Sequence, residues 1–399
     1  AGIVAGANNG YATIFNYGDI VATSKYYSVG LVSGSYYYDA TVINTGDITA
    51  TGDGAIGINA RTVFGDAYVY SSGNINAAAQ YYTALGINAS TYYGDATVRN
   101  SGDIAASSEN DVATGINATT RYGNASVLST GDITVASVDG NVNGINAYSL
   151  YDVYVGSGGD INATTTYGNA VGISARSQFG SVAVFNSGNI SATGYDYAVG
   201  INAFTDYDVT VGNLGDISAS SQYNLAFGIN AVSRYGDVYV GNYGEITANT
   251  VYSSAFGINA TTRYGDVFVG NAGDISATAN YSTYGINAYS RYGVVVGNQG
   301  SITAASQYSN SRGINAQSRY SDVLVQSSGD FDVSSVYGSA TGIYAESIYG
   351  DVVVRSMSNM NVSADDSSAT GIYAQAFNGT SSVSNGGDLI VSGYSFAQG

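Results

Sequence analysis

Acidic side chains recur at a fixed spacing along this chain and are the first candidates for chemistry. In two columns, a carboxylate follows a turn and directly precedes a strand-like segment. The first column comprises Asp39, Asp66, Asp95, Asp152, Asp208, Asp237, Asp266, Asp322 and Asp351. The second comprises Asp19, Asp47, Asp103, Asp132, Asp160, Asp216, Glu245, Asp274, Asp330 and Asp388. Carboxylates in such turns commonly accept local backbone N–H groups, so we expect a turn role for both columns.

A calcium site is the alternative interpretation of these acids. Like charges stacked about 5 Å apart repel each other, and Ca²⁺, which takes carboxylate and carbonyl oxygens, relieves such repulsion. The candidate ligands are Asp103, Asp132, Asp160, Asp216 and Asp274. The chain does not repeat the G-G-x-G-x-D spacing of the nonapeptide calcium β-roll. Neutral residues also dilute the columns, namely Asn74, Asn124, Asn189 and Ser301.

The chain offers few groups for nucleophilic or acid–base catalysis. It has no His and no Cys, and Lys25 is its only Lys. Asp365 and Asp366 are adjacent, but two carboxylates in one turn are more often solvated. The other carboxylate pairs come from a repeat and are much the same in every copy. We therefore expect no enzymatic activity and no cofactor.

Aromatic residues form two further columns. The first comprises Tyr37, Phe64, Tyr93, Tyr122, Tyr151, Phe179, Tyr207, Tyr235, Tyr264, Tyr292, Tyr320 and Tyr349. Five Arg residues directly precede members of this column, and we expect them to stack on the rings: Arg121, Arg234, Arg263, Arg291 and Arg319. The second, looser column comprises Tyr81, Tyr167, Tyr195, Tyr223, Tyr252 and Tyr337. Stacking is the expected role of the first column, whereas surface contact and core filling are equally plausible for the second.

An Asn column accompanies the aromatic ones: Asn59, Asn88, Asn117, Asn146, Asn202, Asn230, Asn259, Asn287 and Asn315. Stacked Asn side chains can hydrogen-bond from one copy to the next, as in cross-β structures, and we expect this structural role. The alternative is a flat hydrogen-bonding surface for sugars or ice. The residues that we single out for contact are Asn230, Asn259, Asn287, Tyr235, Tyr264, Tyr292 and Tyr320.

All these columns come from one tandem repeat of 27–29 residues that covers residues 1–399 without a linker. Its heading Gly recurs fourteen times, at Gly2, Gly30, Gly57, Gly86, Gly115, Gly144, Gly172, Gly200, Gly228, Gly257, Gly285, Gly313, Gly342 and Gly371. Self-similarity at a period of about 20–50 residues is typical of solenoids, propellers and arrays. Propeller blades need about 40–50 residues, so the shorter unit favours a solenoid.

Each unit carries three short segments in which apolar residues alternate with polar ones, the signature of half-buried strands. In the unit that begins at Gly257, alternation places six side chains on one face: Ile258, Ala260, Val267, Val269, Ile275 and Ala277. Asn259, Phe268 and Ser276 point the other way. The absence of Pro suits a chain that needs nearly every backbone N–H in a ladder, and Gly at the corners is expected to supply turns with positive φ. The predicted fold is an all-β, single-domain parallel β-solenoid of about fourteen coils, each with three short strands.

The charge and hydropathy of the chain limit which classes of partner and which locations we expect. The formal net charge is −18, which argues against nucleic acids and anionic membranes as partners. No apolar stretch reaches the roughly 18 residues that a membrane-spanning helix needs. No basic segment of a signal peptide precedes Ala1, so we expect any such leader to have been removed or never present.

The repeat Y-G-D-V-x-V-x-N-x-G-D-I-x-A…G-I-N-A, best seen in residues 235–260, resembles repeats in the secreted passenger regions of Gram-negative autotransporter and adhesin-type proteins. The resemblance covers essentially the whole chain. It implies a right-handed β-solenoid that is exported through the outer membrane and displayed on the cell surface. The family pattern includes a C-terminal membrane β-barrel that residues 1–399 do not show, so we expect that it was cleaved or that this is a different, secreted protein. The resemblance assigns no catalytic residue.

Both ends of the chain follow the repeat and show no polar cap of the kind that solenoids normally use. We expect the terminal coils to stack head-to-tail through Gly2, Ile3, Ile372, Tyr373 and Leu389, by adding strand to strand, into a surface fibre or matrix filament. The alternative is that residues 1–399 are one piece of a longer passenger. A monomeric adhesin that binds a glycan or a host ligand through its Tyr and Asn columns remains the second functional hypothesis.

Overall fold

The computed structural model describes residues 1–399 and contains only β-strands and turns. The strands belong to three parallel sheets, and each coil of the β-solenoid contributes one strand to each sheet, over about fourteen coils. The chain divides into two compact units: the first comprises Ala1–Tyr195 with Asn202–Thr205, and the second Asp196–Ile201 with Asp206–Gly399. The predicted fold class is confirmed.

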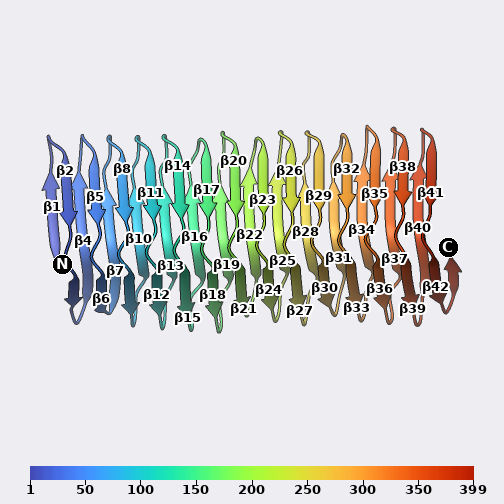
Figure 1. Cartoon of the computed structure of the whole chain (residues 1–399), viewed down its shortest axis with the longest axis horizontal. Helices are drawn as coiled ribbons and strands as arrows, with labels where there is room; N and C mark the ends of the chain where they lie inside the picture. Colours follow the sequence, from blue (N-terminus) through green and yellow to red (C-terminus); the bar gives the residue numbers. More distant parts are fainter. The chain divides into compact units, whose positions relative to one another are not determined.

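In the first unit, every third strand lies beside the next one in the same sheet (Figure 1). The first sheet contains β1 (Ile3–Ala7), β4 (Tyr27–Ser35), β7 (Gly54–Arg61), β10 (Ala84–Ser90), β13 (Ala113–Thr119), β16 (Val142–Tyr148) and β19 (Ala170–Arg176). The second contains β2 (Ala12–Asn16), β5 (Ala40–Asn44), β8 (Ala67–Ser71), β11 (Ala96–Asn100), β14 (Ala125–Ser129), β17 (Val153–Ser157) and β20 (Val182–Asn186). The third contains β3 (Ile20–Thr23), β6 (Ile48–Gly52), β9 (Ile75–Ala79), β12 (Ile104–Ser108), β15 (Ile133–Ser137), β18 (Ile161–Thr165) and β21 (Ile190–Gly194).

The second unit repeats this order, and β22 (Ala198–Thr205) holds residues of both units. Its first sheet contains β25 (Ala226–Ser233), β28 (Ala255–Thr261), β31 (Thr283–Tyr289), β34 (Ser311–Ser318), β37 (Ala340–Ser347), β40 (Ser368–Ala376) and β43 (Phe396–Gln398). Its second contains β23 (Val209–Asn213), β26 (Val238–Asn242), β29 (Val267–Asn271), β32 (Val294–Asn298), β35 (Val323–Ser327), β38 (Val352–Ser356) and β41 (Ser381–Asn385). Its third contains β24 (Ile217–Ser221), β27 (Ile246–Thr250), β30 (Ile275–Ala279), β33 (Ile302–Ser306), β36 (Phe331–Ser335), β39 (Met360–Ala364) and β42 (Leu389–Gly393).

Equivalent residues of neighbouring coils pair with each other. Between β28 and β31, for example, Ile258 pairs with Ile286 and Asn259 with Asn287. The six apolar residues predicted to face inward in this coil are all buried: Ile258, Ala260, Val267, Val269, Ile275 and Ala277. Because the side chains of a strand alternate between its faces, this register stacks each inward residue on its own equivalent, and the core is a set of Ile, Val and Ala columns.

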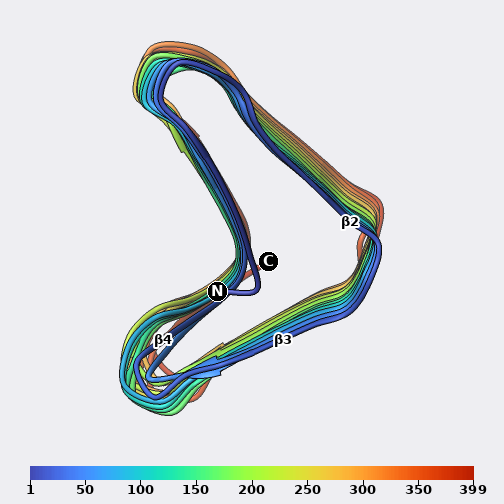
Figure 2. The ribbon, with the colours of Figure 1, turned by 90° about the vertical axis from the view of Figure 1, so that its left-hand side faces the viewer.

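Strands of the first sheet bend at the heading Gly. Two successive residues there, Gly257 and Ile258 in β28, are both buried, so the inside–outside alternation shifts by one residue. The outward residues on the two sides of the bend are Phe256 and Asn259. Seen end-on, the coils of the first unit show β2 and β3 as two sides, with a third side that folds inward at its middle (Figure 2). The outer surface of the first sheet is therefore concave along the bend.

The chain has no residue with positive φ, so the expected positive-φ turns at Gly are wrong. Glycine is needed instead where the backbone lies very close to neighbouring atoms. At the heading Gly257, an added Cβ would lie 2.3 Å from Ile275 Cγ2 and 2.6 Å from the Gly285 carbonyl oxygen. At the corner residue Gly265, it would lie 2.0 Å from the Gly236 carbonyl oxygen of the neighbouring coil. Only glycine lets the bend touch the third sheet and lets successive corners stack at this distance.

Each second-sheet strand from β2 to β38 ends on a buried polar side chain that our sequence reasoning missed. In the second unit this inner amide column comprises Asn213, Asn242, Asn271 and Asn298, all of them buried. Each Nδ2 donates to the carbonyl oxygen of the Gly two residues further on at 2.6–2.7 Å. The Nδ2 of the first three also donates to the next Asn Oδ1 at 2.8 Å, whereas that of Asn298 donates to Ser327 Oγ at 3.2 Å. The period-2 alternation of β29 already places Asn271 on the same face as Val267 and Val269, and that signal could have predicted its burial.

Candidate functional site

The acidic columns lie at two corners of the coil, and their carboxylates form hydrogen bonds from one coil to the next. The Asp103 Oδ1 accepts the backbone N–H of Asp132 at 3.0 Å, and the Asp132 Oδ1 accepts that of Asp160 at 2.9 Å. The first column does the same, since Asp237 and Asp266 are joined by an N–H···Oδ1 bond of 2.8 Å. The expectation that these carboxylates accept N–H groups of their own turn is therefore wrong. Along both columns, an Asp Oδ1 instead accepts the backbone N–H of the equivalent residue of the next coil, and this charge-assisted bond offsets the repulsion within the column.

The five calcium candidates lie in the second acidic column, at the corner between the second and third sheets. In each unit one carboxylate oxygen of these ladders is taken by a backbone N–H, as for Asp160 with Asn189 at 2.7 Å and Asp274 with Ser301 at 2.7 Å. No group of three or more acidic side chains gathers in an arrangement that could hold a metal ion. Calcium binding at Asp103, Asp132, Asp160, Asp216 or Asp274 stays a prediction, with carbonyl oxygens as the remaining ligands.

The Asn column of the first sheet faces outward and forms hydrogen-bonded ladders. In the first unit, Nδ2-to-Oδ1 bonds of 2.7–2.8 Å connect Asn59, Asn88, Asn117 and Asn146. In the second unit, bonds of 2.6–2.7 Å connect Asn230, Asn259, Asn287 and Asn315. The predicted rung-to-rung bonding is confirmed, and it places the contact candidates Asn230, Asn259 and Asn287 on one side of the concave bend.

The second-unit ladder ends in a polar network across this bend. The Arg312 Nη1 donates to Asn315 Oδ1 at 2.6 Å, and its guanidinium lies 4.0 Å from the centre of the Tyr344 ring. The Tyr344 hydroxyl donates to Glu346 Oε2 at 2.6 Å, and Gln317 donates to the same oxygen at 3.1 Å. Tyr344 thus occupies the position that Asn holds in the preceding coils, and three neighbouring coils supply its surroundings.

Tyr344 has the most perturbed titration in the chain. Burial, followed by the hydrogen bond and the negative charge of Glu346, raises its pKa to about 12, although Arg312 acts in the opposite direction. Its ring also stacks on Tyr373, with ring centres 4.8 Å apart. The pKa of Tyr239 is raised as well, by burial and by the neighbouring Asp237. Perturbed groups often mark functional sites, but here the raised pKa keeps a phenol protonated and provides no base.

The first aromatic column stacks at the corner between the first and second sheets. In the first unit, Tyr37, Phe64, Tyr93 and Tyr122 stack with ring centres 4.9–5.4 Å apart. In the second unit the stack is broken into pairs, Tyr235 with Tyr264 at 5.6 Å and Tyr320 with Tyr349 at 5.7 Å. Here Arg234, Arg263, Arg291 and Arg319 lie 5.1–5.2 Å from tyrosine ring centres. The predicted stacking of rings and of Arg on Tyr is confirmed, while Tyr292 and Tyr320 lie 6.2 Å apart and tilted.

The second tyrosine column lies on the surface, at the corner between the third and first sheets. Five of its six predicted members are exposed, so core filling is wrong for them and surface contact stays a prediction: Tyr81, Tyr167, Tyr223, Tyr252 and Tyr337. Tyr281 and Tyr308 continue the column, each two residues after the end of a third-sheet strand, and both are about half exposed. Our sequence reading did not assign them to it.

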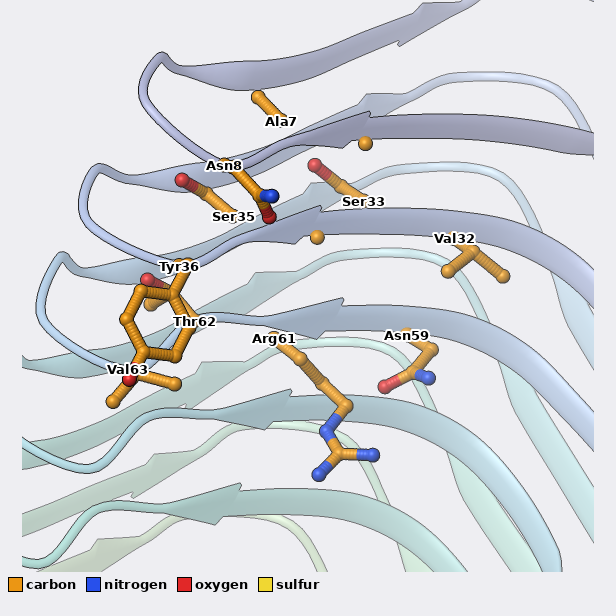
Figure 3. Close-up of a pocket in the computed structure, with 12 residues that line it drawn as sticks. Ala7, Asn8, Val32, Ser33, Ser35, Tyr36, Asn59, Arg61, Thr62 and Val63 are labelled. Atoms are coloured by element: carbon orange, nitrogen blue, oxygen red, sulfur yellow. The ribbon is translucent and has the colours of Figure 1, made fainter.

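Two surface hollows accompany the ladders, one in each unit. The first, of about 780 Å³, lies over β4 and β7 and is bordered by Asn59, Arg61 and Tyr36 (Figure 3). The second is a groove of about 670 Å³ along the ends of the second-sheet strands, from β26 to β41. Its floor includes Gly241 and Gly270, where an added Cβ would meet nothing within 4 Å. Both hollows present amide, hydroxyl and guanidinium groups that can hydrogen-bond a polar ligand.

The residues predicted to mediate end-to-end contact lie in the terminal coils. In the first coil, Ile3 is partly exposed, and an added Cβ at Gly2 would lie 2.5 Å from Ile20 Cγ2. In the last coils, Ile372 is buried, Leu389 is half-buried and Tyr373 stacks on Tyr344. Only Ile3 among them is an exposed apolar side chain, and end-to-end contact through these residues stays a prediction.

The chain contains no helix long and apolar enough to cross a membrane. No protein-family model, curated protein or solved structure matches the chain significantly. The assignment of function therefore rests on the ladders and hollows described above.

Proposed function

We propose that this chain is a non-enzymatic structural or adhesive protein of the cell exterior, in which stacked coils form a filament or a surface fibre. The observation that carries the proposal is the register of the three sheets. Every coil offers the next one the same strand N–H and C=O groups, the same amide columns and the same corner carboxylates. A coil of a second copy meets the same complementary set as a coil of the same chain, so the ladder is a ready template for self-association.

The composition of the surface supports an extracellular setting. The columns that face outward are tyrosine, asparagine and aspartate, and the formal net charge of −18 keeps separate stacks apart in solution. Tyrosine is a contact residue that is enriched at interfaces. These features suit a protein that meets surfaces and polymers, and we propose that its coils are displayed outside the cell.

Electron microscopy and analytical ultracentrifugation of the purified chain test this proposal. We expect filaments or a concentration-dependent series of oligomers, because head-to-tail contact between coils is heterologous and does not close into a ring. A single monomeric species at every concentration, with no filaments, would contradict self-association. Cell fractionation with surface proteolysis tests the location.

A second candidate function is a monomeric adhesin that binds a glycan. The specific observation in its favour is the groove in the second unit, which combines a glycine floor with Tyr243, Gln299, Gln326 and Arg355. Aromatic and hydrogen-bonding groups of this kind line many sites for polar ligands. A glycan array with the wild-type chain and with the double variant Tyr243→Ala/Arg355→Ala tests it. Signals that do not depend on these two residues would place any glycan binding elsewhere.

A further inference from the structure

The second tyrosine column contains pairs of phenols held side by side on the surface. Tyr308 and Tyr337 follow the third-sheet strands of neighbouring coils, and their rings are parallel to within 4° with centres 5.6 Å apart. Tyr223 and Tyr252 form a second such pair, with centres 5.1 Å apart and a 28° angle between the rings. The backbone N–H of Tyr337 donates to the Gln307 carbonyl oxygen at 2.9 Å, which holds the two corners in register.

The rest of the chain has few side chains that compete with tyrosine for an oxidant. It contains 38 Tyr, two Met, and no Cys, Trp or His. One-electron oxidation of the exposed surface therefore falls on phenols. The same composition leaves the coils without any disulfide, so a covalent link between coils has to come from another side chain.

We propose that the stacked tyrosine pairs, with Tyr308–Tyr337 as the best-placed one, are sites of dityrosine cross-linking between adjacent coils by a peroxidase and hydrogen peroxide. Each phenol gives up one electron and one proton and becomes a neutral phenoxyl radical. The two radicals join through the ring carbons next to their hydroxyl groups, and the hydrogen on each of these carbons then moves to oxygen and restores the phenols. The two electrons and two protons reduce one hydrogen peroxide to two waters, so the product is lighter by two hydrogen atoms.

The relative orientation of the rings, and not their exposure, decides which neighbouring tyrosine is cross-linked to Tyr308. Tyr281, Tyr308 and Tyr337 are 52%, 53% and 54% exposed, so an oxidant reaches all three equally. Tyr281 and Tyr308 lie 6.4 Å apart, however, and their rings are inclined by 54°. In the parallel pair, the two ring planes lie alongside each other, and rotation about the soft terminal torsion of an exposed ring brings the reacting carbons together. In the tilted pair, the rings are farther apart and inclined, which hinders this approach.

Peptide mapping of the oxidised full chain tests the proposal. The purified chain is treated with peroxidase and substoichiometric hydrogen peroxide across a dilution series, and dityrosine is followed by its blue fluorescence and by mass spectrometry. We expect an intramolecular cross-link between the peptides of Tyr308 and Tyr337 whose yield per chain does not change on dilution. Tyr337→Phe should abolish this cross-linked peptide, whereas Tyr281→Phe, the matched control, should leave it unchanged.

Both variants keep the aromatic ring, so folding is preserved and circular dichroism verifies it. Three results would overturn the proposal. These are cross-links from Tyr308 to Tyr281 as often as to Tyr337, cross-links found only between chains and lost on dilution, and oxidation without dityrosine at this corner. None of them bears on the proposed filament, which is measured without oxidant.

Discussion

The inner amide column differs between the two units, although the strands around it are alike. In the second unit, four successive Asn side chains donate to one another at 2.8 Å. In the first unit, Ser interrupts the column at Ser71, Ser129 and Ser157, whereas in the second unit Ser appears only after this Asn run, at Ser327 and Ser356. Asn44 and Asn100 reach their Ser partners at 3.2 Å, while the Asn100 Oδ1 and the Ser157 Oγ are buried without a hydrogen-bond partner.

This difference separates two roles of the inward side chains. The heading Gly and the apolar columns continue through both units, with Phe331 and Met360 in place of Ile in the second, and they dictate the coil itself. The polar column tolerates Asn or Ser, because both fit and both donate, but only Asn fills the donor and acceptor positions together. A buried polar atom without a partner costs about 1–3 kcal/mol. We infer that the coils around Asn100 and Ser157 are less stable than those around Asn242 and Asn271.

The largest expected effect comes from substituting the heading Gly, a feature that both units share. Gly86→Ala in the first unit and Gly257→Ala in the second place a Cβ 2.3 Å from an Ile Cγ2 in the third sheet. We expect each variant to lose about 3 kcal/mol of local stability, the upper range for overpacking, measured by hydrogen exchange in the affected coil. As a control, Gly270→Ala meets nothing within 4 Å and should gain about 0.5–1 kcal/mol by restricting the unfolded chain. Equal effects of Gly257→Ala and Gly270→Ala would refute the close-approach account.

The next effect compares the inner amide column of the second unit with that of the first. Asn242 takes part in three hydrogen bonds, to Gly244, Asn271 and Asn213, so Asn242→Ala should cost about 2–3 kcal/mol. Asn100 already leaves its Oδ1 unpaired, and Asn100→Ala should cost only about 1 kcal/mol. Denaturant titration that follows each coil separately measures both. A larger loss for Asn100→Ala would reverse the proposed order of the units.

Replacing a Ser of the first unit's inner amide column by Asn tests the comparison of the two units in the opposite direction. Ser71 is buried between Asn44 and Asn100, at the position that Asn occupies in the second unit. Ser71→Asn should let Asn44 donate to a carboxamide oxygen and should supply a donor to the orphaned Asn100 Oδ1. We expect a gain of about 1 kcal/mol in the stability of these coils, seen as slower amide exchange. Faster exchange would mean that the site lacks room for the larger side chain.

The smallest effect concerns the outer face, where the units also differ. The outward amide column of the first unit passes from Asn146 to Ser174, whereas that of the second unit reaches Tyr344. The pKa of Tyr344 is raised from 10.0 to about 12, so its contribution to stability is complete below pH 10 and is lost as the pH rises through 12. Glu346→Gln should lower this pKa toward 10.0, measured as the difference in phenolate absorbance between each protein and its Tyr344→Phe derivative. An unchanged pKa would exclude Glu346 as a cause.

The sequence predicted most of the fold because the repeat length, the alternation and the absence of Pro all indicate the same stacked strands. Inward residues such as Ile258 and Val267, and the outward ladder of Asn259, followed from alternation alone. The roles of Gly and Asp did not. Close approach at Gly257 and the capping of Asp266 by Asp237 are contacts between coils, and a reading of one coil at a time assigned them to its own turns.

The candidate site was less predictable. The network of Arg312, Tyr344 and Glu346 depends on two coils that meet across a bend, and that bend appears only as a one-residue shift in the alternation. The grooves and the parallel tyrosine pair at Tyr308 and Tyr337 depend on side-chain directions at corners, which vary even when the residue type repeats. Periodicity therefore predicted which residues form columns, but it could not predict which members of a column touch.

Amide hydrogen exchange resolved coil by coil tests the central claim most directly, namely that the inner amide column sets the relative stability of otherwise equivalent coils. Local opening free energies report such differences within one molecule. We predict strong protection in all three sheets, with the slowest exchange in the coils of Asn242 and Asn271 and faster exchange in those of Asn100 and Ser157. Equal protection in both sets of coils, or slower exchange around Asn100 and Ser157, would contradict the account.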